Sequence, residues 1–108
     1  MDEQEFMTAA DAELARIEAA LEAASDSGAA DFDFELKPGG IIEIEFDNGS
    51  KVIVNRHAAA REIWLAAKSG GFHFRPEGGR WLGTRDGEEL TVALSRVISQ
   101  QAGTSVKL

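Results

Sequence analysis

The apolar residues in the first quarter of the chain recur at helical intervals. Steps of four, four, three and four residues separate five positions that share one helical face: Phe6, Ala10, Leu14, Ile17 and Leu21. Most of the remaining positions are alanine or glutamate, and both residues favour a helix. The pattern therefore predicts an amphipathic helix over residues 4–24, followed by a loop at 25–30.

Beyond residue 30 the apolar pattern changes to short strand-like runs. Turns rich in glycine, proline or asparagine separate six of them: 31–36, 41–46, 51–55, 62–68, 72–75 and 80–83. Such closely spaced hairpin signals predict a mainly antiparallel sheet. By itself the run at 62–68 is also compatible with a helical turn, but its neighbours favour a strand.

A second amphipathic pattern closes the chain and predicts a helix over residues 88–101. Its apolar face holds Leu90, Leu94, Val97, Ile98 and Gln101, and Gly103 supplies a stop signal. The order is thus one helix, about six strands and one helix. We expect a single α+β domain over residues 1–108, built as a two-layer α/β sandwich in which both terminal helices cover one face of the sheet. Val106 and Leu108 of the tail are expected to cover apolar surface.

Strand parity predicts which face each side chain takes. In residues 31–36, DFDFEL, the apolar Phe32, Phe34 and Leu36 should face the helices, and the acids should face away.

Parity also decides the turn at residues 47–49. A bulged loop that pairs Asp47 with Lys51 buries Val52 and Val54, whereas a two-residue loop would bury a lysine and an asparagine.

The same parity directs Trp64 outward. It predicts either an exposed contact residue or a half-exposed side chain that packs across its neighbours.

Charge is distributed unevenly along the chain. The formal net charge is −8, and residues 1–35 hold eleven acids and a single base. Such a field repels phosphate backbones, so we expect no nucleic-acid partner.

The sequence has no cysteine, no apparent export signal and no run long enough to span a membrane, so we expect a cytoplasmic protein without a membrane association.

The acids of the first third fall into two sets that can meet. On a helical wheel Asp11, Glu18 and Glu22 lie within an arc of roughly 40° beside the apolar stripe, and Arg16 lies on the opposite flank. Asp26 continues this line. If the helix lies along the first strand, these carboxylates join a second set: Asp31, Asp33 and Glu35. Together they would form an acidic ridge that attracts hard cations weakly and exchangeably. The alternative is an ordinary solvated face.

Nothing in the sequence supports an enzyme. The nucleophile-elbow, zinc-protease, phosphate-loop and dinucleotide-binding motifs are all absent, and the glycine pairs read as hairpin turns. His57 and His73 occupy no recognised catalytic pair. A redox reaction at a bound metal would need a ligand set that includes a histidine, and the sequence does not show one.

Several stretches together resemble the frataxin family, in particular its bacterial type. The matching stretches are FDNGSKVIVNR at 46–56, EIWLAAKSGGFHF at 62–74, RW at 80–81, DGEEL at 86–90 and SQQAG at 99–103. This resemblance covers nearly the whole chain. It implies a frataxin-like sandwich and an accessory role in iron–sulfur cluster assembly. The departures are fewer acids near the end of the first helix and RHAAAR at 56–61, where relatives often have a proline.

The resemblance also implies ligands and partners. Iron, as Fe²⁺ or Fe³⁺ and with other divalent cations as alternatives, would bind at Asp11, Glu18, Glu22, Asp26, Asp31, Asp33 and Glu35. The cysteine desulfurase and the iron–sulfur scaffold protein would be the partners, contacted through Glu18, Glu22, Asp31, Asp33, Asn55 and Trp64. We expect a monomer, with iron-dependent oligomers as the open alternative. A second interpretation is an acidic interaction module that regulates a basic partner without any metal role.

Overall fold

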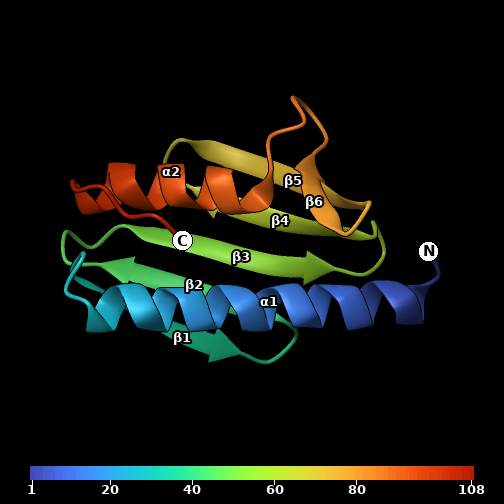
Figure 1. Cartoon of the computed structure of the whole chain (residues 1–108), viewed down its shortest axis with the longest axis horizontal. Coiled ribbons are helices and arrows are strands. Elements are labelled where there is room, and N and C mark those ends of the chain that lie inside the picture. Colours follow the sequence, from blue (N-terminus) through green and yellow to red (C-terminus); the bar gives the residue numbers. More distant parts are fainter.

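The computed structural model describes residues 1–108 and contains two helices and six strands. Their bounds are α1 Glu3–Asp26, β1 Phe32–Lys37, β2 Ile41–Phe46, β3 Lys51–His57, β4 Glu62–Ala67, β5 Gly70–Glu77, β6 Arg80–Gly83 and α2 Leu90–Ala102. The strands form one antiparallel sheet in the order of the sequence, from β1 to β6. Both helices lie side by side on one face of this sheet (Figure 1). The predicted α+β sandwich is therefore confirmed.

The predicted apolar stripe of α1 is the part of the helix that is buried. Phe6, Ala10, Leu14, Ile17 and Leu21 all lie in the core. The helix begins at a capping box, in which the Asp2 carboxylate accepts from the Glu5 backbone N–H at 2.8 Å and the Glu5 side chain accepts from the Asp2 N–H at 3.1 Å. No helix of the structure is long and apolar enough to cross a membrane.

The β2–β3 hairpin confirms the predicted faces but not the predicted pairing. Val52 and Val54 are fully buried, as the bulged loop requires. Lys51, however, pairs with Glu45 rather than with Asp47, and the Phe46 N–H donates to the Ser50 carbonyl at 2.9 Å. The partner of Lys51 thus lies two residues before the predicted one. A shift of two residues keeps every side chain on its predicted face, so the faces are correct although the predicted pair is wrong. Gly49 at φ 85° closes the three-residue loop.

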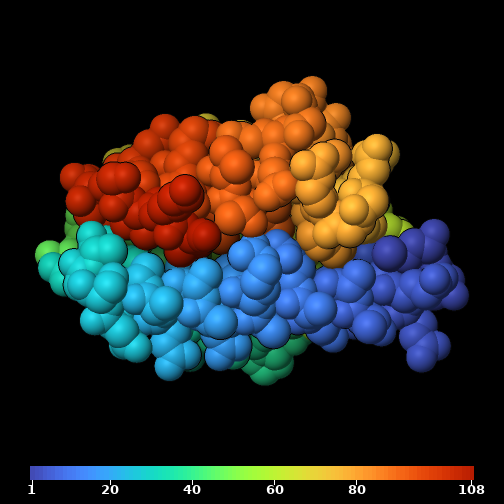
Figure 2. Space-filling view, in the orientation of Figure 1, coloured from blue at the N-terminus to red at the C-terminus, as the bar shows by residue number.

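The inner face of β1 is covered only in part. Phe32 is 7% exposed, Phe34 is half-buried and Leu36 is 51% exposed. Leu36 therefore lies on the predicted face but is not buried beneath the helices. The reason is that β1 is an edge strand and α1 does not cover its last residues. Figure 2 shows the green surface of β1 emerging beside the blue helix α1.

The end of α2 is fastened to two hairpin turns by one buried amide. The Gln101 side chain donates to Ser50 Oγ at 3.0 Å and to the Lys51 carbonyl at 3.1 Å, and accepts from the Lys68 N–H at 2.9 Å. Asn48 adds a bond to the Gln101 carbonyl at 2.8 Å. The C-terminal Val106 is buried and Leu108 packs against the core, as predicted.

Candidate functional site

The acidic ridge lies along α1 and the neighbouring strand β1. Six of its seven carboxylates form no ion pair and no side-chain hydrogen bond in the structure: Glu18, Glu22, Asp26, Asp31, Asp33 and Glu35. All of these except the half-buried Glu18 are exposed. Arg16 is bound on the far flank of α1, where it donates to Glu13 at 2.8 Å and to Thr91 at 2.7 Å. None of these six residues is therefore fixed by direct contact with a basic side chain, although the charge of Lys37 acts on the nearby Glu35.

Asp11 differs from the rest of the ridge because it has a basic partner. Arg56 Nη1 lies 2.6 Å from Asp11 Oδ1 and joins α1 to β3. The side chain of Arg56 crosses the backbone at Gly40, where an added Cβ would lie 2.5 Å from Nη1. A cation that binds at Asp11 must therefore compete with a guanidinium held in place by the surrounding fold.

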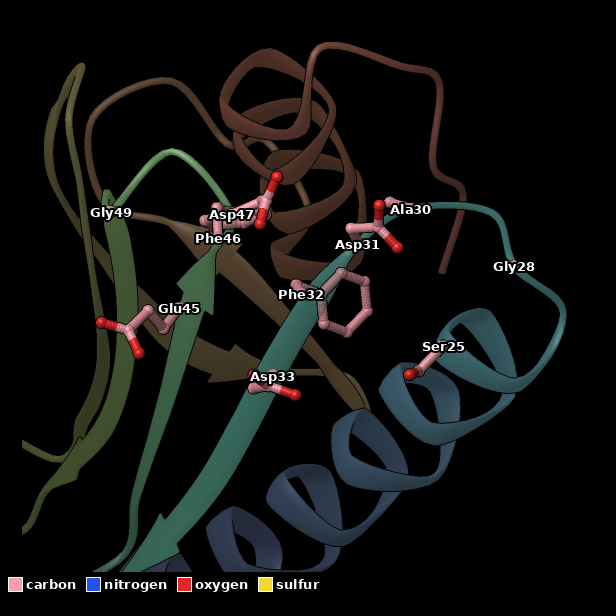
Figure 3. Close-up of a pocket in the computed structure, with 10 residues that line it drawn as sticks. All are labelled: Ser25, Gly28, Ala30, Asp31, Phe32, Asp33, Glu45, Phe46, Asp47 and Gly49. Carbon is pink, nitrogen blue, oxygen red and sulfur yellow. The ribbon is translucent and has the colours of Figure 1, made fainter.

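A shallow depression of about 610 Å³ opens where β1 begins and β2 ends. Four carboxylates line it, and Figure 3 shows that they lie around the ends of the two strands without pointing toward a common centre: Asp31, Asp33, Glu45 and Asp47. The sequence interpretation missed Glu45 and Asp47. The β1–β2 register pairs Asp33 directly with Glu45 and Glu35 with Glu43, so like charges face one another across the strands.

Two lysines offset part of this charge. Glu43 lies 2.6 Å from Lys37 and 3.0 Å from Lys51. Hydrogen bonds from both ammonium groups lower the pKa of Glu43, and the same contacts raise the pKa values of both lysines. Within the whole chain, no group of three or more Asp, Glu or His side chains is arranged to hold a metal ion. The geometry is that of an open charged surface rather than a preformed coordination site.

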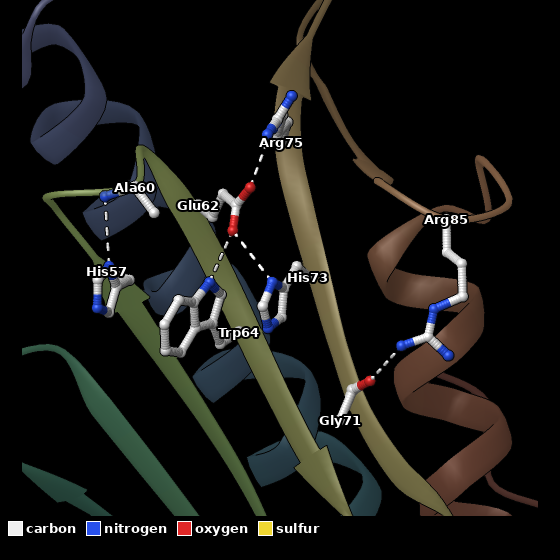
Figure 4. Close-up of polar contacts among 8 residues, drawn as sticks. All are labelled: His57, Ala60, Glu62, Trp64, Gly71, His73, Arg75 and Arg85. Atoms are coloured by element: carbon white, nitrogen blue, oxygen red, sulfur yellow. Dashed lines mark hydrogen bonds and ion pairs between the residues drawn. The ribbon is translucent and has the colours of Figure 1, made fainter.

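The outer face of the sheet carries a second feature, built around Trp64 on β4. Its ring is stacked between His57 of β3, at a centroid distance of 3.8 Å, and His73 of β5, at 4.5 Å (Figure 4). Trp64 is therefore half-exposed and packs across both neighbouring strands, which confirms the second of the two predicted arrangements. Asn55 lies opposite Trp64 in the β3–β4 register.

One buried carboxylate holds this stack in place. Glu62, only 5% exposed, accepts from Trp64 Nε1 at 2.8 Å and from Arg75 Nε at 2.9 Å, and its Oε1 lies 3.3 Å from His73 Nδ1. Burial would raise the pKa of Glu62. The hydrogen bonds from Trp64 and Arg75 and the charges of His73 and Arg75 outweigh that effect, so the pKa lies below its ordinary value.

We define the outer-face cluster as His57, Glu62, Trp64, His73 and Arg75, and of these the sequence interpretation names only Trp64 as a candidate site residue. Parity gives Glu62 the same face as Trp64, but it does not reveal that Glu62 is buried. The pairing of Trp64 with His73 would have followed from aligning β4 with β5. The pattern predicts a strand that ends at residue 55 and leaves His57 in the following link, whereas β3 extends to His57 and the link contains only residues 58–61.

Comparison with known proteins places this fold in a family. The frataxin-like domain model matches residues 1–104. Among curated relatives, the chain is 56% identical to the "Iron-sulfur cluster assembly protein CyaY" of Dechloromonas aromatica over 108 residues, covering 100% of this chain and 99% of that protein. It is 54% identical to the protein of the same name from Cupriavidus pinatubonensis, covering 100% and 96%.

Solved structures agree with this assignment. Frataxin from Psychromonas ingrahamii superimposes with a TM-score of 0.81 at 29% identity, over 99% of this chain and 97% of that one. Trimeric frataxin from Saccharomyces cerevisiae, complexed with ferrous, gives a TM-score of 0.76 at 26% identity, over 89% and 87%. The chain belongs to the frataxin family.

Proposed function

We propose that this chain is a non-catalytic, iron-binding accessory protein of iron–sulfur cluster assembly, acting in the cytoplasm. It binds Fe²⁺ or Fe³⁺ weakly on the acidic ridge and regulates the cysteine desulfurase–scaffold complex or supplies it with iron. The observation that carries this proposal is the set of six carboxylates without ion-pair partners on α1 and β1. The names of the relatives, and the ferrous complex of the yeast frataxin, support the same conclusion.

Iron is the cargo in this proposal. Carboxylate oxygens are suitable ligands for hard cations, and the exposed positions leave room for bound water and for rapid exchange. Because no three acids converge, each iron would use one or two carboxylates, and affinity would come mainly from the summed field of the ridge. Asp11, a member of the predicted set, contributes less because Arg56 already occupies it.

The same charge would steer and dock a basic surface of the desulfurase. Docking of this kind weakens with salt and acts strongly on the association rate. Asn55 and the half-exposed Trp64 would add contacts on the outer face of the sheet. Since iron and partner would share Glu18, Glu22, Asp31 and Asp33, each should change the affinity of the other.

The test is a desulfurase assay with and without this protein over a range of iron concentrations. The proposal expects an effect on cysteine turnover that depends on iron and on the ridge. The double variant Glu22→Gln/Asp33→Asn should lower desulfurase affinity by about tenfold at low salt. Glu3→Gln/Glu77→Gln is the matched control, because it removes the same charge away from the ridge. Equal losses in both variants would refute the docking assignment.

Iron binding itself is tested by titration with Fe²⁺ followed by backbone NMR. Perturbed signals should concentrate in residues 18–35. Perturbation confined to His57 and His73, with the ridge silent, would contradict the proposed iron site.

A second candidate is an acidic interaction module without a metal role, and the lack of a converging ligand set favours it. In that case the Glu22→Gln/Asp33→Asn variant would still lose the partner. Iron chelation, however, would leave the effect on the desulfurase unchanged.

A further inference from the structure

The two edges of the sheet are not equally open. At the far edge, the chain itself covers β6: Leu82 bridges to Glu89, and the Gly83 N–H donates to the Glu88 carbonyl at 2.8 Å. At the near edge, β1 pairs only with β2. The six residues of β1 therefore form the only long edge of the sheet with a free row of backbone groups (Figure 1).

The register identifies which backbone groups are free. Two hydrogen bonds at the ends of the β2–β3 pair fix its alternation: the Phe46 N–H donates to the Ser50 carbonyl at 2.9 Å, and the Arg56 N–H donates to the carbonyl of Gly40, just before β2, at 3.0 Å. Residues alternate between the two neighbours of an antiparallel strand. The odd residues of β2 therefore bond to Asp33, Glu35 and Lys37 of β1. This alternation leaves the N–H and carbonyl groups of Phe32, Phe34 and Leu36 pointing away from the sheet.

Leu36 leaves an apolar side chain open on the helix side of this edge. It is 51% exposed, and the groove of about 230 Å³ beside it is lined by Leu14 and Ala15 of α1 and also by charged side chains, among them Lys37 and Arg56. On the opposite side of the strand, Asp33 and Glu35 carry charge with no ion-pair partner. The edge thus offers apolar contacts on one face and negative charge on the other.

We infer that β1 is a strand-addition site for an extended segment of a partner protein in which basic and apolar residues alternate. The segment pairs with Phe32, Phe34 and Leu36 through backbone hydrogen bonds. Its apolar side chains lie beside the exposed Leu36 on the helix side of the sheet, and its lysines or arginines lie beside Asp33 and Glu35. A second copy of this chain is disfavoured as the occupant, because pairing of two β1 strands sets acids against acids.

This inference rests on the proposed function, since it gives a docking mode for the basic partner of the ridge. Charge attraction alone would tolerate any conformation of that partner. Strand addition instead requires free N–H groups along one edge of the bound segment, and this requirement separates the two modes.

The probe is a short acetylated peptide of alternating lysine and valine that spans β1. Paired in this register, its valine N–H groups point to β1 and its lysine N–H groups point to solvent. Backbone N-methylation of the valines should weaken binding by about tenfold or more, because several hydrogen bonds are lost. N-methylation of the lysines should leave binding within about threefold of the parent peptide, since charge and composition are the same.

Amide hydrogen exchange gives the complementary result on the protein. The bound peptide should slow exchange at Phe32, Phe34 and Leu36. Leu36→Lys should lower the affinity of the peptide for β1, because a lysine at this edge position blocks an added strand and repels the lysines of the peptide. Val92→Lys is the matched control, since Val92 on α2 is 55% exposed and lies away from this edge.

Equal binding of both methylated peptides, or unchanged exchange at the three amides, would overturn strand addition. The desulfurase assay with Glu22→Gln/Asp33→Asn decides the proposed function separately. If that variant loses the desulfurase while the two peptides bind equally, docking on the ridge stands and the strand mode fails.

Discussion

The acidic ridge and the outer-face cluster show two opposite ways to place carboxylates on one small sheet. On the ridge, six acids have no basic partner and no hydrogen-bond donor from the chain. In the outer-face cluster, the single acid Glu62 is buried and receives hydrogen bonds from Trp64 and Arg75. Unpaired charge costs folding free energy but stays available to ligands, whereas satisfied charge fixes the shape of a surface. We therefore expect the ridge to attract cargo and partners and the cluster to present a rigid contact.

The sharpest test of this contrast is to remove one carboxylate from each region. Glu62→Ala removes the acceptor of the partly buried Trp64 Nε1–H and the partner of Arg75, and should lower the free energy of unfolding by about 1–3 kcal/mol. Glu35→Ala, the matched strand position on the ridge, should change it by less than about 0.5 kcal/mol. Urea denaturation measures both. Similar losses in the two variants would remove the distinction.

Acid titration isolates the charged part of the Glu62 effect. Because the folded state lowers the pKa of Glu62, its stabilisation is complete above the ordinary value of about 4.5 and is lost as the pH falls through the lower folded-state value. In Glu62→Gln the decline of unfolding free energy below pH 4.5 should be shallower. Curves that run parallel for the two proteins would show that Glu62 is not the group responsible.

The histidine stack should contribute less than Glu62. His57→Ala or His73→Ala removes one stacked ring from Trp64, with an expected loss of about 0.5–1.5 kcal/mol in urea denaturation. His57→Phe should restore most of the loss because it keeps a ring against the indole. The NMR signal of the Trp64 Nε1–H should persist in His57→Ala, since Glu62 still accepts that proton. Disappearance of the signal would indicate that His57 holds the tryptophan rather than merely covering it.

The smallest effect concerns relief of repulsion on the ridge. Glu18 and Glu22 are one helical turn apart, and Asp33 faces Glu45 across the β1–β2 pair. Each such pair of like charges lowers the folding stability by a few tenths of a kcal/mol. Added salt or a divalent cation should raise Tm by about 1–4 °C. Glu22→Gln/Asp33→Asn should raise the starting Tm and reduce this response. A Tm that does not respond to salt or cations would contradict a clustered ridge.

The sequence predicts the elements and faces because apolar periodicity follows directly from helix and strand geometry. It predicts the hairpin parity of Val52 and Val54 for the same reason, but not the pairing of Lys51, because shifts of two residues bury the same side chains. Parity predicts the face of Leu36 but not its burial, because parity cannot show where α1 stops covering β1. The outer-face cluster depends on contacts between three strands, so Glu62 and the two histidines emerge only when the strands are aligned. The residues of the ridge follow from helical spacing on α1 and from alternation along β1.

The hydrogen bonds of the Gln101 side chain connect the last turn of α2 to two hairpin turns. Loss of the last turn of α2 would release Lys68 in the β4–β5 turn and Ser50 in the β2–β3 turn at the same moment. These three segments should then open as one cooperative unit well below the free energy of global unfolding. In native-state hydrogen exchange, the Lys68 amide would report on the end of a helix that is distant in sequence, and Gln101→Ala would divide that unit into independent parts.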